Sequence, residues 1–139
     1  MRKNLLLMLC IMAVVGCASI GTRSGTNAGR IMAAKSAYVV RHPKSSKDID
    51  LYIQEALANR GMTVTVGPEE QIPLDVDMYI RYSDRWTWDM RMYMTTLSVS
   101  VYDRKTDAVI KSAEFRNSAF HLGSARNWTK NVINKLFEE

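Results

Sequence analysis

Few side chains in this sequence combine the type and the spacing that metal binding or catalysis requires. The two histidines, His42 and His121, each stand at the end of a strand-like segment, and neither belongs to an HExxH or other paired motif that would hold zinc. Ser112 and Ser118 lie outside any GxSxG or SxxK motif, and the chain has no glycine-rich phosphate loop. We therefore expect no metal, no cofactor and no nucleophilic serine.

Asp84 is the carboxylate whose neighbours raise the question of acid catalysis. It interrupts a run in which every second residue is apolar. A carboxyl group on an apolar face can have a raised pKa and act as a general acid, and a hydrolase would pair Asp84 with Asp89 or His121. A β-bulge that returns Asp84 to solvent is the simpler interpretation. We therefore expect that the protein is not an enzyme, with the Asp84 hydrolase as the weakest alternative.

The two cysteines have different fates once the N-terminus is interpreted. Two basic residues precede an apolar run at residues 5–15, which is shorter than the ~20 residues that a membrane-spanning helix needs. A basic start, a short apolar run and small residues at its end are the layout of an export signal. Cleavage before Cys17 would remove Cys10 and leave a single cysteine, so neither a disulfide nor a thiolate zinc site would form.

The segment VVGC at residues 14–17 resembles the lipobox of bacterial lipoproteins, in which an apolar and a small residue precede a cysteine. The resemblance implies cleavage between Gly16 and Cys17 and attachment of diacylglycerol to the Cys17 thiol. Ala18, where an inner-membrane lipoprotein would have Asp, is similar to the outer-membrane class. The expected location is the periplasmic face of the outer membrane, with the chain anchored by lipid rather than spanning. An ordinary cleaved signal is the alternative.

The charge of the mature chain argues against a nucleic-acid partner. The full chain has 19 basic and 14 acidic residues; loss of Arg2 and Lys3 leaves 17 against 14, a net charge of +3. That excess is too small to indicate nucleic-acid binding. We divide the chain into a signal peptide (1–16), a flexible tether rich in Gly, Ser, Thr, Asn and Ala (17–35), and a single domain (36–139).

The domain is predicted to be α+β, a mostly antiparallel sheet of about five strands with two helices packed on one face. The expected order is strand, helix, strand, three-strand meander, helix. Strand-forming residues, caps and helical spacing place these elements at residues 36–43, 45–61, 62–68, 76–90, 96–103, 109–120 and 124–139. Ser45 or Ser46 is expected to cap the first helix and Ser124 the second, and Val109, Ala113 and Phe115 are expected to share one side of the last strand.

Residues 76–90 alternate between apolar and polar side chains almost without exception, which predicts a long strand with one buried and one wet face. A bulge is expected near Ser83 and Asp84. Trp86 and Trp88 share the apolar face about 7 Å apart, so they either pack beneath the helices, which we favour, or form a stacking platform for a sugar ring.

The far end of this strand is the candidate binding surface. Where the helices stop short of Trp88, Met90 and Met92, these side chains would form an adaptable apolar patch. Arg85 and Arg91 occupy the opposite face. That face is interpreted mainly as solvated, and otherwise as a contact surface for a partner protein or an acidic envelope polymer.

The strand also carries a recognisable pattern, Y-x-D-x-W-x-W-D followed by D-x-x-T. It comprises Tyr82, Asp84, Trp86, Trp88 and Asp89, then Asp103 and Thr106. This pattern resembles small Gram-negative outer-membrane lipoproteins of uncharacterised function, which bring no established catalytic residues. The expected function is a non-enzymatic binding or accessory module of the cell envelope with a protein or glycan partner. The alternative is a glycan- or peptidoglycan-binding module that uses Trp86 and Trp88.

Overall fold

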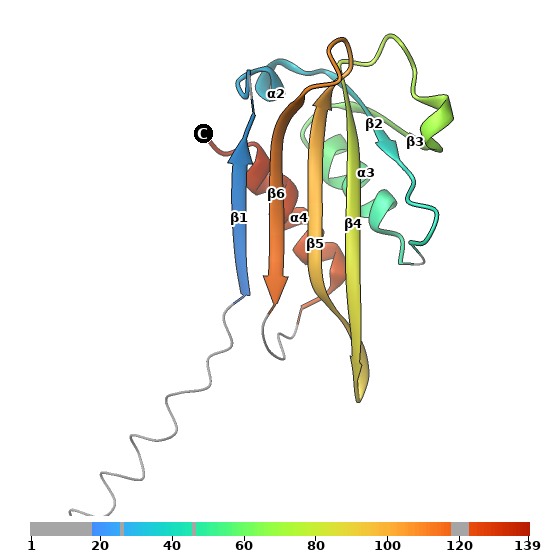
Figure 1. Ribbon diagram of the computed structural model, residues 1–139, viewed down its shortest axis with the longest axis vertical. Coiled ribbons are helices and arrows are strands. Elements are labelled where there is room, and N and C mark those ends of the chain that lie inside the picture. The colour runs from blue at the N-terminus through green and yellow to red at the C-terminus, as the bar shows by residue number, and fades with distance from the viewer. Residues whose placement is uncertain (1–17, 26, 46, 118–122) are drawn as a thin grey trace, which may run out of the picture.

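The computed structural model describes residues 18–25, 27–45, 47–117 and 123–139. Gly16, Cys17 and His121, to which the sequence assigned possible roles, lie outside these residues. In the described part of the chain, no helix is long and apolar enough to cross a bilayer. A single six-stranded sheet, in the order β1-β6-β5-β4-β2-β3, carries its two main helices on one face (Figure 1). The predicted α+β class is confirmed, with one strand more than expected.

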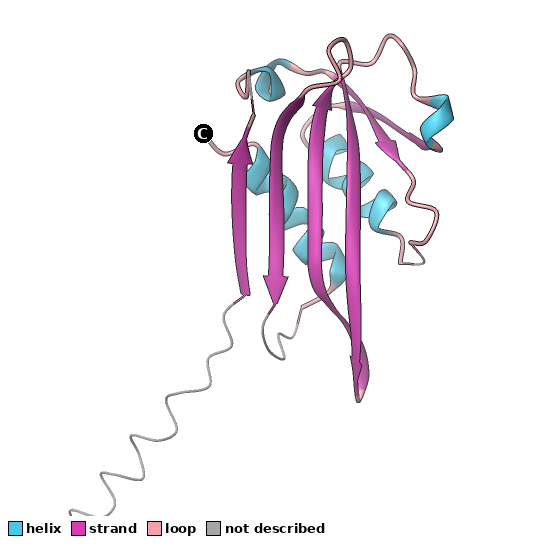
Figure 2. Cartoon of the chain, viewed as in Figure 1, coloured by secondary structure: helices cyan, strands magenta, loops and turns pink. Residues whose placement is uncertain are grey.

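Figure 2 distinguishes the helices, in cyan, from the strands, in magenta. The strands are β1 (Ala18–Ser24), β2 (Ser36–Val40), β3 (Thr63–Gly67), β4 (Met78–Asp89), β5 (Arg91–Asp103) and β6 (Val109–Asn117). The helices are α2 (Arg30–Ala33), α3 (Ile49–Ala58) and α4 (Ala125–Leu136), with a 3-10 turn, η2 (Glu69–Gln71). β4, β5 and β6 form the expected antiparallel meander, whereas β2 is parallel to both of its neighbours.

The segment predicted to be a flexible tether, residues 17–35, is largely part of the fold. β1 pairs with β6 over its whole length, and Ile31 of α2 is buried in the core. Arg30 forms an ion pair with the buried carboxylate of Asp103. A strand at a sheet edge is held by backbone hydrogen bonds that require no apolar side chains, so its composition resembled that of a linker. The tether prediction is therefore wrong for residues 18–24 and 30–33.

The core lies between the sheet and the helices α3 and α4. Its largest fully buried side chains come from both layers: Phe115, Ile49, Ile53, Leu57, Met78, Ile80, Leu97, Ile133, Leu136, Val39, Val99 and Val101. Ser124 caps α4 as predicted, since its Oγ accepts a hydrogen bond from the Asn127 amide at 3.2 Å. The N-cap of α3 is Asp48, in the left-handed region and without a side-chain cap bond, rather than Ser45; Ser46, the other predicted cap, lies outside the described residues.

Two bulges shift the side-chain alternation along the meander. In the first bulge, the pairing of β4 with β5 shifts between Arg85 and Trp86, and Thr95 of β5 is the additional residue. This position is two residues beyond the predicted one. The second makes Ile110 the additional residue of β6, so Ile110 enters the core and Val109 is exposed. The prediction that Val109 shares the buried side of β6 is therefore wrong, while Ala113 and Phe115 are buried as expected.

Candidate binding surfaces

The hairpin between β4 and β5 extends beyond the end of the other strands (Figure 1). β6 pairs with β5 as far as Thr96, opposite Arg116, and β4 and β5 then continue as a two-stranded ribbon. Met90 alone connects Asp89 to its register partner Arg91, with a φ of 59°. We call residues 87–93 the hairpin tip.

The hairpin tip exposes the apolar side chains that the sequence placed at the end of the buried face. Exposed fractions are 68% for Trp88, 91% for Met90 and 45% for Met92. Arg85 and Arg91 are also exposed, at the base and at the tip of the hairpin. Exposed apolar side chains beside cationic ones make the hairpin tip a candidate interaction surface.

Trp86 lies two residues before Trp88 on β4, closer to the core, and its side chain contacts other residues of the domain. It packs against the core cluster, and its indole Nε1 donates a hydrogen bond to Asp84 Oδ2 at 2.6 Å. The Lys47 ammonium lies 5.5 Å from the centre of the Trp86 ring, a cation–π distance. The core interpretation thus fits Trp86 and the surface interpretation fits Trp88, and the two rings do not form a free platform.

The acid-catalysis alternative gains no geometric support from Asp84. Its carboxylate accepts the Trp86 indole hydrogen bond. Asp89 lies five residues further along the same strand, about 17 Å away at strand spacing, which exceeds the separation of about 5–9.5 Å used by paired carboxylates in glycoside hydrolysis. Among the described residues, no three His, Cys, Asp or Glu side chains are grouped so that they could hold a metal ion.

A cavity of about 200 Å³ lies between the hairpin and the start of α4. Its apolar wall comes from both elements: Trp86, Met92, Met94 and Trp128. The Trp128 ring also stacks on Phe115 with ring centres 4.4 Å apart. Gly123 permits this packing, because a Cβ there would lie 2.3 Å from Trp128 Nε1. Trp128 belongs to the helix predicted at 124–139, and no local pattern indicates that this segment will meet a strand about 40 residues away in the sequence.

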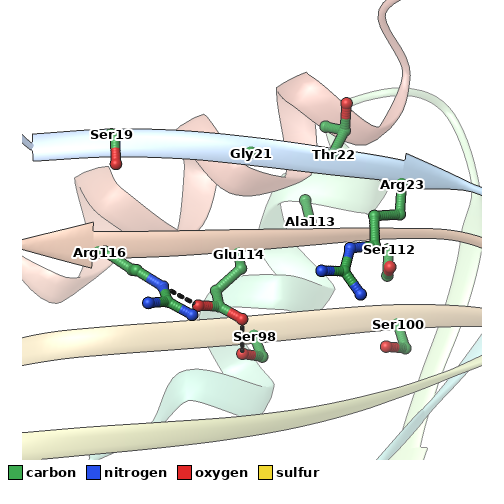
Figure 3. A pocket seen from close by; sticks show the side chains of 10 residues that line it. All are labelled: Ser19, Gly21, Thr22, Arg23, Ser98, Ser100, Ser112, Ala113, Glu114 and Arg116. Atoms are coloured by element: carbon green, nitrogen blue, oxygen red, sulfur yellow. Dashed lines mark hydrogen bonds and ion pairs between the residues drawn. The ribbon is translucent and has the colours of Figure 1, made fainter.

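The sheet face opposite the helices is polar and open. A hollow of about 390 Å³ crosses β1, β6 and β5 (Figure 3) and is lined by Ser19, Gly21, Thr22, Arg23, Ser98, Ser100, Ser112, Ala113, Glu114 and Arg116. Glu114 pairs with Arg116 and accepts a hydrogen bond from Ser98 Oγ at 3.4 Å. The guanidinium of Arg23 extends from β1 across β6 (Figure 3). Hydroxyls and guanidinium groups on one surface can bind polar or anionic ligands.

The polar face continues over β4 and then gives way to a packed aromatic cluster. A second hollow, of about 500 Å³, adds Ser83 and Arg85 to the same surface. Further along, the rings of Tyr79 and Tyr102 stack with centres 5.0 Å apart, and the Arg81 guanidinium lies within 5.2 Å of both. Burial raises the pKa of Tyr79. The predicted wet face is therefore open at the end where β1 begins and closed by this aromatic cluster at the other end.

Comparison with known proteins identifies the fold. No protein-family model and no curated protein sequence matches the chain. The PelC dodecamer from Paraburkholderia phytofirmans has a similar structure, with a TM-score of 0.58 at 15% identity over 86% of this chain and 94% of that chain. A PDZ domain protein from Parabacteroides distasonis gives 0.54 at 9% identity over 97% of this chain and 39% of that chain. A minor lipoprotein from Acinetobacter baumannii gives 0.37 at 14% identity, covering 75% and 87%.

Proposed function

We propose that the protein is a lipoprotein of the cell envelope, anchored through Cys17 to the periplasmic face of the outer membrane, which binds a partner and catalyses no reaction. The observation that carries the proposal is the open polar face of the sheet. Hydroxyl and guanidinium groups line two adjoining hollows there. In contrast, the candidate carboxylate for acid catalysis, Asp84, accepts a hydrogen bond from the Trp86 indole. The VVGC motif at residues 14–17 supports the anchor.

The partner on the polar face is a polar or anionic envelope polymer or protein. Arg23, Arg85 and Arg116 are exposed over the face, and Glu114 neutralises Arg116. A net positive contact surface favours carboxylate- or phosphate-bearing partners. The glycan platform of Trp86 and Trp88 is the less suitable alternative, because only Trp88 has a free ring face of the kind that stacking on a sugar requires.

Lipid attachment is tested by labelling with a fatty acid in a Gram-negative host. Wild-type protein should carry the label and fractionate with outer membranes. The Cys17→Ser variant should do neither, because only a thiol at this position can form the thioether. An unlabelled, soluble wild-type protein would refute the anchor.

Partner binding is tested by photo-crosslinking in intact cells. A photoreactive residue at Ser100 or Ser112, both on the polar face, should capture the same partner. The matched control is Lys130 on the exposed side of α4, which should capture none. Arg23→Glu should weaken capture from Ser112. Equal capture from all three positions, or none from the polar face, would refute this surface.

A further inference from the structure

The first residue of β1 lies at the same end of the sheet as the hairpin tip (Figure 1). The register shows it directly: Ser19 pairs with Arg116, Arg116 with Thr96, and Thr96 with Arg85. These four residues form one row across the sheet. Ala18, one residue before this row, is therefore level with the base of the hairpin tip. Any anchor on the residue that precedes Ala18 in the chain enters at this end.

Because β1 begins at Ala18, directly after the proposed acylation site Cys17, the distance between the folded domain and its lipid anchor is short. One residue of backbone spans at most about 3.8 Å between Cα atoms. From Trp86, level with Ala18, to Asp89 is three residues of strand, or about 10 Å. With the strands upright on the membrane, the hairpin tip would reach past Cys17 by several ångströms. This is comparable with the 5–10 Å to which amphipathic segments enter the headgroup and acyl boundary.

The hairpin tip has the side chains of a membrane-interface segment. Trp88, Met90 and Met92 are exposed, and tryptophan favours the interface because its ring is apolar and its N–H polar. Arg85 and Arg91 flank them and can extend their guanidinium groups to lipid phosphates. Met90 has a left-handed φ of 59°, a conformation that glycine or asparagine adopts more easily. An apolar residue at this turn therefore needs a reason other than folding.

We propose that the hairpin tip inserts into the lipid leaflet that holds the acyl chains of Cys17. The inference rests on the proposed anchor and adds a second, non-covalent membrane attachment. Together the two attachments hold the strands upright on the membrane, because β6 separates β1 from the β4–β5 hairpin at this end of the sheet.

The test places one fluorophore at the tip of the lipidated protein. Acylation consumes the Cys17 thiol, so Met90→Cys supplies the only free thiol for an NBD label. The protein is reconstituted in vesicles of phosphatidylethanolamine and phosphatidylglycerol. We expect a blue-shifted emission that nitroxide groups on the lipid acyl chains quench and aqueous iodide does not. The matched control is Lys105→Cys, exposed in the turn at the opposite end of the sheet, which should remain in water.

Two further measurements make the outcome decisive. In the Met90→Cys background, Trp88→Ser with Met92→Ser should leave the probe accessible to iodide while the fatty-acid label is retained. Equal iodide access at positions 90 and 105 of the labelled wild-type background overturns insertion but leaves the anchor intact. Loss of the fatty-acid label instead refutes the anchor. A probe shielded from iodide yet unquenched by lipid nitroxides indicates contact with a second copy and also overturns insertion.

Discussion

Met90 shows how one residue can be poorly suited to the fold and well suited to a surface. Its side chain is 91% exposed, so it buries little apolar area within the domain. Its left-handed backbone disfavours an L-residue by roughly 1–2 kcal/mol. Residues held in sparsely populated conformations concentrate at functional sites. The strain at Met90 and the exposure of its neighbours Trp88 and Met92 are thus explained together by contact with lipid.

Met90→Gly should leave the free energy of unfolding unchanged or raise it by up to about 1 kcal/mol. Glycine removes the steric strain at a positive φ, and the greater entropy of the unfolded chain offsets part of that gain. Urea denaturation of the soluble Cys17→Ser protein measures the change. Gly61, whose φ is 86°, is the reciprocal control: Gly61→Ala should lower the free energy of unfolding by about 1 kcal/mol. A marked loss of stability in Met90→Gly would show that the methionine supports the fold.

At the scale of elements, the period of two predicted the long strand β4 and the buried side of its first half, Met78, Ile80 and Tyr82. Periodicity indicates which side chains share a face but not how far the helices on that face extend, so it could not separate Trp86 from Trp88. The bulges at Thr95 and Ile110 depend on pairing between strands and leave no local signal. For the same reason β1, whose contacts are mostly backbone, could not be recognised from composition.

The ion pair between Asp103 of β5 and Arg30 holds α2 against the sheet. Replacement of Asp103 therefore tests whether the segment predicted to be a flexible tether contributes to the stability of the fold. Although burial alone would raise its pKa, the backbone N–H groups of Thr106 and Lys105 and the charge of Arg30 lower the pKa of Asp103 below its ordinary value. A lowered pKa in the folded state contributes stability above the ordinary value of about 3.9. That stability is lost as the pH falls from about 4 through the folded pKa.

Asp103→Asn should therefore lower the free energy of unfolding by about 1–3 kcal/mol at pH 7, and by less below pH 4. Denaturation at several pH values measures both effects. Arg30→Ala should reproduce part of the loss, because Arg30 is the ion-pair partner of Asp103. Asp75, which is exposed, provides the control: Asp75→Asn should have little effect. If Arg30→Ala is as stable as wild type, α2 contributes nothing measurable through this pair.

Gly123 is the residue on which the packing of α4 against the hairpin base depends. Gly123→Ala should lower the free energy of unfolding by about 1–3 kcal/mol, because the new Cβ would lie 2.3 Å from Trp128 Nε1 and displace the ring. Thermal denaturation and tryptophan emission report the change. Gly21→Ala on β1 is the matched control, since nothing lies within 4 Å of a Cβ there. An unperturbed Trp128 emission would show that the ring moves aside without loss.

At the scale of the whole molecule, the three surfaces have separate roles. Helices cover one face of the sheet, the other face is open and polar, and one end carries both the start of β1 and the hairpin tip (Figure 1). Insertion of the hairpin tip would orient the strands perpendicular to the membrane. The polar face would then be perpendicular to the membrane plane and would not face the lipid. A partner in the periplasm could then reach Arg23 and Arg116 without competing with lipid.

A linker between Cys17 and Ala18 should separate the two membrane attachments. Ten residues of Ala, Gly and Ser, beginning with Ala to preserve sorting, would add a mean reach of about 16–19 Å. The acyl anchor and the fatty-acid label should be unaffected. The effective concentration of the hairpin tip at the leaflet falls as the connection lengthens, so lipid quenching of a probe at position 90 should decrease. The same ten residues inserted after Lys105, at the opposite end, should leave quenching unchanged. Undiminished quenching with the linker after Cys17 would mean that the tip binds lipid by its own affinity, without help from the direct connection to β1.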